Sequence, residues 1–392
     1  MNNWQKIKIG DIGRIVTGKT PKTKIPEFWE GKIPFVTPVD LQKTKNIQAT
    51  ERTVTEAGLI SVRGAMLPAR AICVSCIGNL GYTAMTTQQS VSNQQINSII
   101  PNSDFDNDFV YYLMKSLWEE FKNLEGQSTT LSILNKTLFS KIEVNVPDLT
   151  TQQKIAEILS SLDDKIELNT QINHNLEEQA KAIFKSWFVD FEPFGGVVPD
   201  NWQKGKLKNI LSLQKRPIKA GISKDLPYLP IDSIPMRTFA ITDVRPNSEA
   251  QSSLLLFDKD DILIGAMRVY FHRVIIAPFD GITRTTCFVL KPNDPAYLSF
   301  ALLTCDLDSS VDFAQKTSKG STMPYAVWDG GMGEIDILIP PLNIAMEFNS
   351  IVFPMLRKIQ DSYREVYSLQ KLRDALLPKL MSGEIDVSEV EI

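Results

Sequence analysis

Two long stretches of the chain carry apolar residues at alternating spacings of four and three, the heptad pattern of a helix that packs along a partner helix. The second stretch repeats the first at an offset of 193 residues. The first seam comprises Ile155, Leu159, Leu162, Ile166, Asn169, Asn173, Leu176, Ala180, Ile183 and Trp187. The second comprises Phe348, Val352, Met355, Ile359, Ser362, Val366, Leu369, Arg373, Leu376 and Leu380. The pattern predicts two long helices.

These helices are predicted to form an antiparallel coiled coil with each other. In that arrangement the polar seam residues Asn169, Asn173 and Ser362 fall near the middle, where a polar layer penalises slipped pairings. The alternative is that each amphipathic helix packs separately onto its own globular part.

Local signals predict where the helices end. Thr150 and Gln153 have the spacing of a capping box at the first helix start. Pro193, Gly195 and Gly196 are predicted to end the first helix, and Gly383 the second. Pro354 and Pro378 each remove a helical hydrogen bond, which predicts a kink or a later start of the second helix.

The segments before the two helices are also copies of each other. Trp4-Gln5-Lys6 corresponds to Trp202-Gln203-Lys204, and both copies later reach an apolar run that ends in proline, at Pro147 and Pro340. Short β-branched runs between turns, plus one amphipathic helix per copy, predict mixed α and β structure. The expected fold class is α+β, with a pseudo-two-fold repeat. The expected divisions are 1–149 and 193–341 for two globular domains, and 150–192 and 342–392 for two spacer helices.

Composition limits the alternatives. At 392 residues with 43% hydrophobic residues the chain is long enough for several folding units. No apolar run reaches the ~20 residues of a membrane span, and the start has no signal-peptide core. We therefore expect a cytoplasmic protein. Four cysteines without a second close pair, and only His174 and His272 as histidines, predict structural thiols and no metal site.

The net charge of −4 at first argues against nucleic acid, but the negative charge lies in the two heptad stretches. The globular segments are neutral or slightly basic and carry clustered lysines and arginines. Such clusters suit phosphate and base-edge contacts. A solvated surface with scattered lysines is the alternative on charge alone.

One enzyme motif matches by letters only. Residues 13–20 fit the phosphate-loop pattern G-x-x-x-x-G-K-[ST]. That motif needs a helix that begins at the lysine, and here Pro21 and Pro26 would interrupt it. Metal-protease, serine-hydrolase and amino-methyltransferase motifs do not occur, and two histidines leave little room for general-base chemistry. We therefore expect no catalytic residues in this chain.

In combination, several segments resemble the specificity subunit of type I restriction-modification systems, and the resemblance covers the chain from end to end. The segments are 17–21, 28–36 with Asp40, 92–94, the Gly-Ser-Thr turns at 126–129 and 320–322, and 146–156. The resemblance implies a non-catalytic subunit with two target recognition domains, each reading half of a split, asymmetric DNA target. It also implies docking of two methyltransferase subunits and up to two restriction subunits, with S-adenosylmethionine bound by the methyltransferase and no cofactor bound here, in a phage-defence system.

About 33 helical residues would span ~50 Å, which exceeds one DNA turn of ~34 Å. Helix length is therefore expected to set the spacer between the half-sites. The predicted DNA contacts in the first domain are Lys19, Lys22, Lys24, Arg70, Asn79, Asn93, Gln94, Ser128 and Thr129. In the second they are Arg216, Lys219, Lys224, Arg268, Tyr270, His272, Arg273, Arg284, Lys319, Ser321 and Thr322. A self-sufficient enzyme and a coiled-coil scaffold without DNA binding are the rival functions, and the recognised bases do not follow from sequence.

Overall fold

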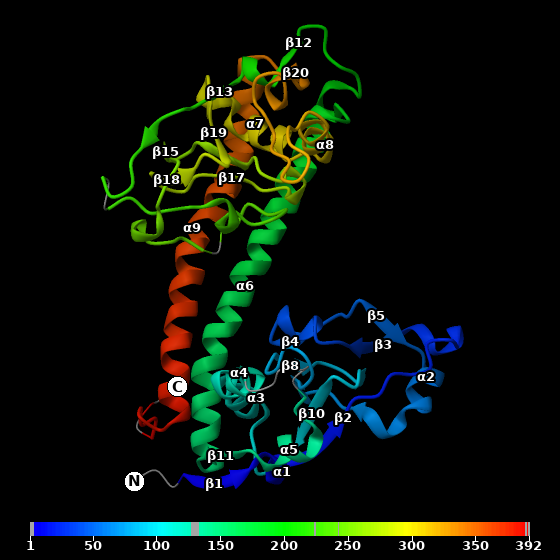
Figure 1. Cartoon of the computed structure of the whole chain (residues 1–392). Helices are drawn as coiled ribbons and strands as arrows, with labels where there is room; N and C mark the ends of the chain where they lie inside the picture. Colours follow the sequence, from blue (N-terminus) through cyan, green and yellow to red (C-terminus); the bar gives the residue numbers. More distant parts are fainter. Residues whose placement is uncertain (1–3, 127–132, 223–224, 242, 389, 391–392) are drawn as a thin grey trace. The chain divides into compact units, whose positions relative to one another are not determined.

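The computed structural model describes residues 4–126, 133–222, 225–241, 243–388 and 390. Figure 1 labels the elements along the chain. The chain divides into two compact units. Unit 1 is Met1–Asp164 with Gln370–Ile392, and unit 2 is Lys165–Leu369. The finer division into two recognition domains and two spacer segments stays a prediction.

Unit 1 contains a five-stranded sheet in the order β2-β10-β7-β8-β4, a four-stranded sheet in the order β5-β3-β9-β6, and the pair β1-β11. The strands are β1 Gln5–Lys8, β2 Gly13–Thr17, β3 Trp29–Val36, β4 Asn46–Ile47, β5 Arg52–Val54, β6 Met66–Leu67, β7 Ile72–Ser75, β8 Thr83–Thr86, β9 Ser90–Ser92, β10 Ile96–Pro101 and β11 Glu143–Val146. The helices before the long ones are α1 Ile9–Ile12, α2 Glu56–Ser61, α3 Asn107–Ser116, α4 Trp118–Gly126 and α5 Lys136–Lys141. The central strand β7 is buried throughout, as expected for a β-branched run inside a sheet.

Unit 2 repeats this plan with sheets β13-β19-β16-β17 and β14-β15-β18, and the pair β12-β20. Its strands are β12 Gln203–Lys206, β13 Leu211–Leu213, β14 Pro217–Ile218, β15 Leu254–Phe257, β16 Ile262–Gly265, β17 Val274–Ile276, β18 Gly281–Arg284, β19 Cys287–Pro292 and β20 Asp336–Ile339. Its shorter helices are α7 Leu298–Cys305 and α8 Asp308–Lys316. The predicted mixed α and β class is confirmed.

The internal repeat extends to individual backbone hydrogen bonds. The amide of the residue after β1 donates to the carbonyl of the residue before β11 (Ile9 to Ile142, 2.9 Å), and the amide of the residue after β12 donates likewise to the carbonyl before β20 (Leu207 to Ile335, 2.9 Å). A second pair of bonds also corresponds. The amide after β7 donates to the carbonyl before β10 (Cys76 to Gln95, 2.7 Å), and the amide after β16 donates to the carbonyl before β19 (Ala266 to Thr286, 2.8 Å). The two copies therefore share one scaffold.

The two long helices are α6 (Leu149–Phe188, green in Figure 1) and α9 (Leu342–Met381, orange to red), of 40 residues each. The predicted capping box at Thr150 is wrong. Asp148 caps α6 instead, because its Oδ1 accepts from the amide of Thr151 at 2.9 Å and its carbonyl accepts from the amide of Gln152 at 3.0 Å.

Helix α9 runs unbroken through Pro354 and Pro378, so the later start, one of the two effects predicted for these prolines, is wrong. Packing of one face into the cores of the two units outweighs the two lost hydrogen bonds. Gly383 follows the helix with φ of 74°, the left-handed conformation that ends helices. The prediction for this helix end is confirmed.

The predicted seam is confirmed within each unit, and every seam position is buried or half-buried. In unit 1 the start of α6 and the end of α9 share one core, through Ile155, Leu159 and Leu380. In unit 2 the remaining parts of both helices share another, through Phe348 and Val352 among others. The helices run antiparallel in each unit, so separate packing of the two helices is wrong.

The polar layer of the seam lies in unit 2. Ser362 Oγ donates to Asn173 Oδ1 at 2.8 Å, and both side chains are buried. A buried polar pair that is satisfied only in one register disfavours slipped alignments. This contact agrees with the predicted register-fixing role of these two residues.

The sequence composition led to expectations about the cysteines, metal sites and membrane-spanning helices. Cys73, Cys76, Cys287 and Cys305 are free and buried, and burial raises the pKa of the Cys76 thiol to about 11, which keeps it protonated. Among the described residues no group of three His, Cys, Asp or Glu side chains is placed to hold a metal ion. Within the same residues, none of the helices has the length and apolar character of a membrane span.

Candidate nucleic-acid interface

One edge of the five-stranded sheet gathers most of the predicted DNA contacts of unit 1. Strands β2 and β7 end at this edge, and β10 begins there, because Ile96 pairs with Ser75 and Asn97 pairs with Thr17. The loops that follow β2 and β7, and the loop before β10, therefore emerge side by side. They carry the predicted contacts Lys19, Lys22, Lys24, Asn79, Asn93 and Gln94, all of them exposed except the half-buried Asn93.

Hydrogen bonds hold these loops together. Thr20 Oγ1 donates to Gln94 Oε1 at 2.7 Å, and the amide of Gly18 donates to the carbonyl of Ile96 at 2.9 Å. A Cβ on Gly18 would collide with the backbone carbonyls of Ser92 and Asn93, so only glycine permits this approach. The loop that carries Lys19 is thus fixed against the loop that carries Gln94.

The lysine-containing segment does not have the backbone structure of a nucleotide-binding phosphate loop. Residues 13–17 form strand β2, and no helix begins at Lys19 within the described segment 18–25. The helix N-terminus that a phosphate loop requires is therefore missing at this place, in agreement with the sequence analysis.

The other unit 1 candidates differ in position. Arg70 lies at the opposite end of β7, where it forms an ion pair with Asp108. Lys45 contacts the same carboxylate at 2.8 Å. Partial burial alone would raise the pKa of Asp108, but Lys45 and Arg70 more than offset this and lower it. Arg70 is therefore separate from the loop edge, and Ser128 and Thr129 lie outside the described residues.

Unit 2 presents its candidates at the equivalent edge. Strand β16 ends at Gly265 and β19 begins at Cys287, and the two residues pair. The following loop carries Arg268, whose amide donates to the carbonyl of Pro324 at 2.8 Å. This bond joins the loop to the turn that carries three exposed candidates, namely Lys319, Ser321 and Thr322.

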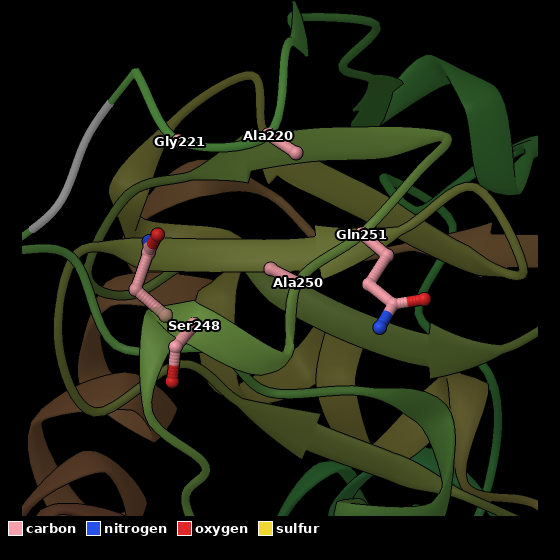
Figure 2. Close-up of a pocket in the computed structure, with 6 residues that line it drawn as sticks. Ala220, Gly221, Ser248, Ala250 and Gln251 are labelled. Carbon is pink, nitrogen blue, oxygen red and sulfur yellow. The ribbon is translucent and has the colours of Figure 1, made fainter.

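The edge continues onto the three-stranded sheet. The amide of Thr285 donates to the carbonyl of Ser253 at 2.9 Å, which places the exposed Arg284 beside the loop that precedes β15. Exposed Lys219 follows β14, which pairs with β15. A pocket at this position is shown in Figure 2, with lining residues Ala220, Gly221, Asn247, Ser248, Ala250 and Gln251. Its amide and hydroxyl groups can donate to and accept from base edges. Lys224 lies outside the described residues.

His272 does not belong to the candidate surface, because its side chain is buried. Its side chain is 4% exposed, and its Nε2 lies 2.8 Å from Asp306 Oδ1. Lys181 of α6 contacts the other oxygen of the same carboxylate at 3.0 Å. The sequence prediction for this residue was wrong, since His272 supports the loop from inside.

Two arginines are also held within unit 2. Arg273 Nη1 donates to the carbonyls of Ile231, at 2.9 Å, and Ile234. Arg216 donates to Asp258 at 2.9 Å and lies 3.6 Å from Asp261. The Arg216 hydrogen bond lowers the pKa of the Asp258 carboxyl, whereas burial raises the pKa of Asp261. Both arginines are half-buried. Arg273 stabilises a loop next to the edge, since its carbonyl accepts from the amide of Gly265, whereas Arg216 contacts the turn between β15 and β16, at the opposite end of these strands.

Sequence reasoning missed three exposed residues at the unit 2 edge. Phe271, Met323 and Tyr325 flank the predicted contacts Arg268, Tyr270 and Lys319. The available signal was the apolar Val-Tyr-Phe run between two basic residues in a loop. Without the fold, such a run could not be distinguished from a buried turn.

Comparisons with known proteins bear on the family to which the chain belongs. A family model described as the type I restriction modification DNA specificity domain matches residues 1–178. The type I restriction enzyme MjaIX specificity subunit of Methanocaldococcus jannaschii is 31% identical over 425 residues, which cover 99% of this chain and 95% of that protein. The HindI specificity subunit of Haemophilus influenzae is 36% identical over 146 residues, 37% of this chain and 32% of that protein.

A solved structure shares the fold. The crystal structure of the type I restriction-modification S subunit from M. genitalium superimposes with a TM-score of 0.65 at 18% identity, over 97% of this chain and 96% of the other. At this identity the match supports the architecture alone. Since the MjaIX relative is more than 30% identical across almost its whole length, the chain belongs to the family of type I restriction-modification specificity subunits.

Proposed function

We propose that this chain reads a split DNA target as the non-catalytic specificity subunit of a type I restriction-modification complex. Unit 1 and unit 2 each read one half-site with the loop edge described above. The observation that carries the proposal is the placement of polar and basic side chains at the same edge of duplicated sheets, in a chain of the specificity family. The shared scaffold fixes where DNA lies, and the diverged loops let the half-sites differ.

Within each edge the side chains divide by chemistry. Exposed cations such as Lys19, Lys219 and Lys319 suit phosphate oxygens, which position the protein without reading sequence. Amides such as those of Gln94 and Gln251 present a donor and an acceptor together, the arrangement that recognises adenine in the major groove. Target sequence is therefore read by the amides and hydroxyls, and binding strength depends on the cations.

In this proposal the catalytic steps are carried out by partner subunits and not by this chain. Two methyltransferase subunits, which bind S-adenosylmethionine and methylate adenine, and up to two restriction subunits would assemble with this chain. The chain itself would bind no cofactor. Its two 40-residue helices, each contributing to both units, would set the spacer between half-sites.

The test combines methylome sequencing of cells with DNA-binding measurements on the purified complex, both made with the chain and its cognate methyltransferase subunit. Methylome sequencing of cells that express the pair should show one bipartite adenine motif with a fixed spacer. Duplex binding should weaken steeply with salt, because phosphate contacts release counterions. A single-part motif, or binding that salt does not change, would contradict the proposal. Methylation by the chain alone would establish the rival enzyme function.

A further inference from the structure

Two neighbouring loops of unit 2 expose four apolar or aromatic side chains between two cations. Exposed fractions are 42% for Tyr270, 36% for Phe271, 51% for Met323 and 48% for Tyr325. We call these four residues the aromatic tip. We propose that the aromatic tip reads the 5-methyl groups of thymines in one half of the target. This inference rests on the proposed function and adds the chemical group that is recognised.

The exposure of the tip is a property of how the loop turns. Val269, next to Tyr270, is 3% exposed and belongs to the core of unit 2. The chain therefore buries one apolar residue and presents the next two outward, with the Tyr270 and Phe271 rings 4.9 Å apart. Contiguous exposed apolar groups on a folded protein mark an interaction site.

The tip is held in place before any ligand arrives. Arg268 and His272 bracket the turn Val269–Phe271 with φ of 51° and 53°, a conformation that side chains other than glycine adopt rarely. The His272 contact with Asp306, which also binds Lys181, anchors one side of the turn. A contact surface that is already ordered loses little conformational entropy on binding.

The second loop of the tip is anchored by backbone bonds. Lys319 and Tyr325 exchange two of them at 2.9 Å, and Met267 forms a bridge with Tyr325. The amide of Arg268 donates to the carbonyl of Pro324 at 2.8 Å. Both loops are thus joined by backbone pairing and present their apolar side chains as one surface.

The charge and the apolar side chains of the two loops favour double-stranded DNA as the occupant. Arg268 and Lys319 are exposed on the same two loops, so a polyanion suits this surface better than an apolar protein face or a neutral ligand. Among the base edges in the major groove, the only apolar group of unmodified DNA is the thymine methyl. Apolar side chains held between phosphate-binding cations therefore fit thymine methyls.

The experiment uses a set of duplexes in each of which one thymine of the target is replaced by uracil, which removes only the methyl group. The chain with its methyltransferase is titrated with these duplexes, as wild type and as the double variant Tyr270→Ala/Phe271→Ala. At one or more positions of a single half-site, uracil should weaken wild-type binding about fourfold, the value for one buried methyl group. The double variant should bind the thymine and uracil duplexes at those positions equally.

Two further variants serve as checks. Met323→Ser should reduce the uracil effect independently of the double variant. Ile60→Ala, which removes a side chain of unit 1 that is 65% exposed, should leave the effect at its wild-type size. Thermal melting verifies that the variants fold.

Each other outcome overturns the inference. Wild-type binding that is specific but indifferent to uracil at every position excludes methyl readout while the proposed function stands. An equal uracil effect in wild type and double variant assigns the methyl contact to other residues. Loss of methyltransferase from the purified double variant makes the tip a protein interface. Absence of specific DNA binding by the wild-type complex contradicts the proposed function itself.

Discussion

Asp163 of α6 is the point where α6, α9 and the globular part of unit 1 meet. Tyr112 of α3 donates to its Oδ2 at 2.7 Å, and Arg373 of α9 donates to its Oδ1 at 2.7 Å. Burial, and then the Asp163 charge, raise the pKa of the Tyr112 phenol, so Tyr112 stays a neutral donor. The three side chains satisfy each other away from water and fix α3 onto both helices.

Arg373→Ala should lower the free energy of unfolding of unit 1 by about 2 to 3 kcal/mol, because it leaves a largely buried carboxylate without its cation. The measurement is the shift of the urea midpoint. Arg364→Ala removes an exposed arginine of the same helix and should change stability by less than about 0.5 kcal/mol. Equal effects of the two substitutions would show that the contact with Asp163 does not stabilise the unit.

Glu177 of α6 provides a pH test in unit 2. Its Oε1 accepts from Thr238 Oγ1 and from the amide of Phe239, the latter at 2.9 Å, yet burial raises the pKa of this carboxyl overall. The folded state therefore holds the proton more tightly than the unfolded state. Stability from this group is highest below the unfolded pKa of about 4.5 and decreases as pH rises through the folded pKa.

Glu177→Gln keeps the accepting Oε1 and removes the buried charge. The variant should melt at the same temperature as wild type or higher at pH 7.5, and this difference should disappear below about pH 4.5. Glu178→Gln, an exposed neighbour on the same helix, serves as control. A Glu177→Gln variant that melts lower than wild type at neutral pH would mean that the ionised carboxylate is stabilising.

Lys19 and Gln94 test the proposed division between phosphate binding and base reading in unit 1. Lys19→Ala should weaken binding to all duplexes alike and reduce the slope of log affinity against log salt by about 1. Gln94→Ala should cost about 1 to 3 kcal/mol at one base pair and relax the motif there. Duplex titrations at several salt concentrations, with a panel of single-base variants, distinguish the two. A sequence-selective effect of Lys19→Ala would contradict the assignment.

At the scale of elements, the start of α6 depends on one carboxylate. Asp148→Ala removes the acceptor of the Thr151 amide and should destabilise unit 1 by about 1 kcal/mol. Thr150→Ala alters the residue that the sequence pattern favoured as cap, and it should have little effect. Thermal melting of both variants decides between the two caps, and a larger loss for Thr150→Ala would support the capping box.

The elements themselves could be predicted because their signals are local and periodic. The seam of both helices, the strands around Val74 and Val289 and the duplicated Ile-to-Pro strands all followed from spacing of apolar residues. The cap at Asp148 was missed because Thr150, two residues later, is also of a type that caps helices and has a glutamine three residues beyond it. The bounds 342–392 gave the start of α9, but a later start stood beside them as one predicted effect of Pro354, because sequence alone shows the hydrogen bond lost there and not the core that compensates for it.

The candidate site was predicted less completely, for a different reason. Lys19 and Gln94 are 75 residues apart in sequence and became neighbours only through strand pairing. His272 looked like a surface residue because Asp306, its partner, lies 34 residues away. Whether a basic side chain faces solvent or a buried carboxylate depends on such distant partners, which spacing does not reveal.

For the whole molecule, duplication separates scaffold from specificity. The backbone bonds that recur in both units lie at the sheet ends, whereas the loops between them differ in length and chemistry. Two residues of the aromatic tip, Tyr270 and Phe271, lie in the loop after β16, and the equivalent loop of unit 1, after β7, carries Asn79. The two half-sites should accordingly differ in sequence, as an asymmetric target requires.

The spacer between half-sites should follow helix length. Inserting one heptad into both helices, after Asp164 and after Leu369, keeps the seam in phase and adds about 10.5 Å to each helix. Methylome sequencing should then show both half-sites unchanged and the spacer longer by about three base pairs, at 3.4 Å per base pair. The same seven residues placed in α6 alone would break the antiparallel register and should reduce methylation instead. An unchanged spacer in the doubly extended chain would show that something other than the helices sets the distance.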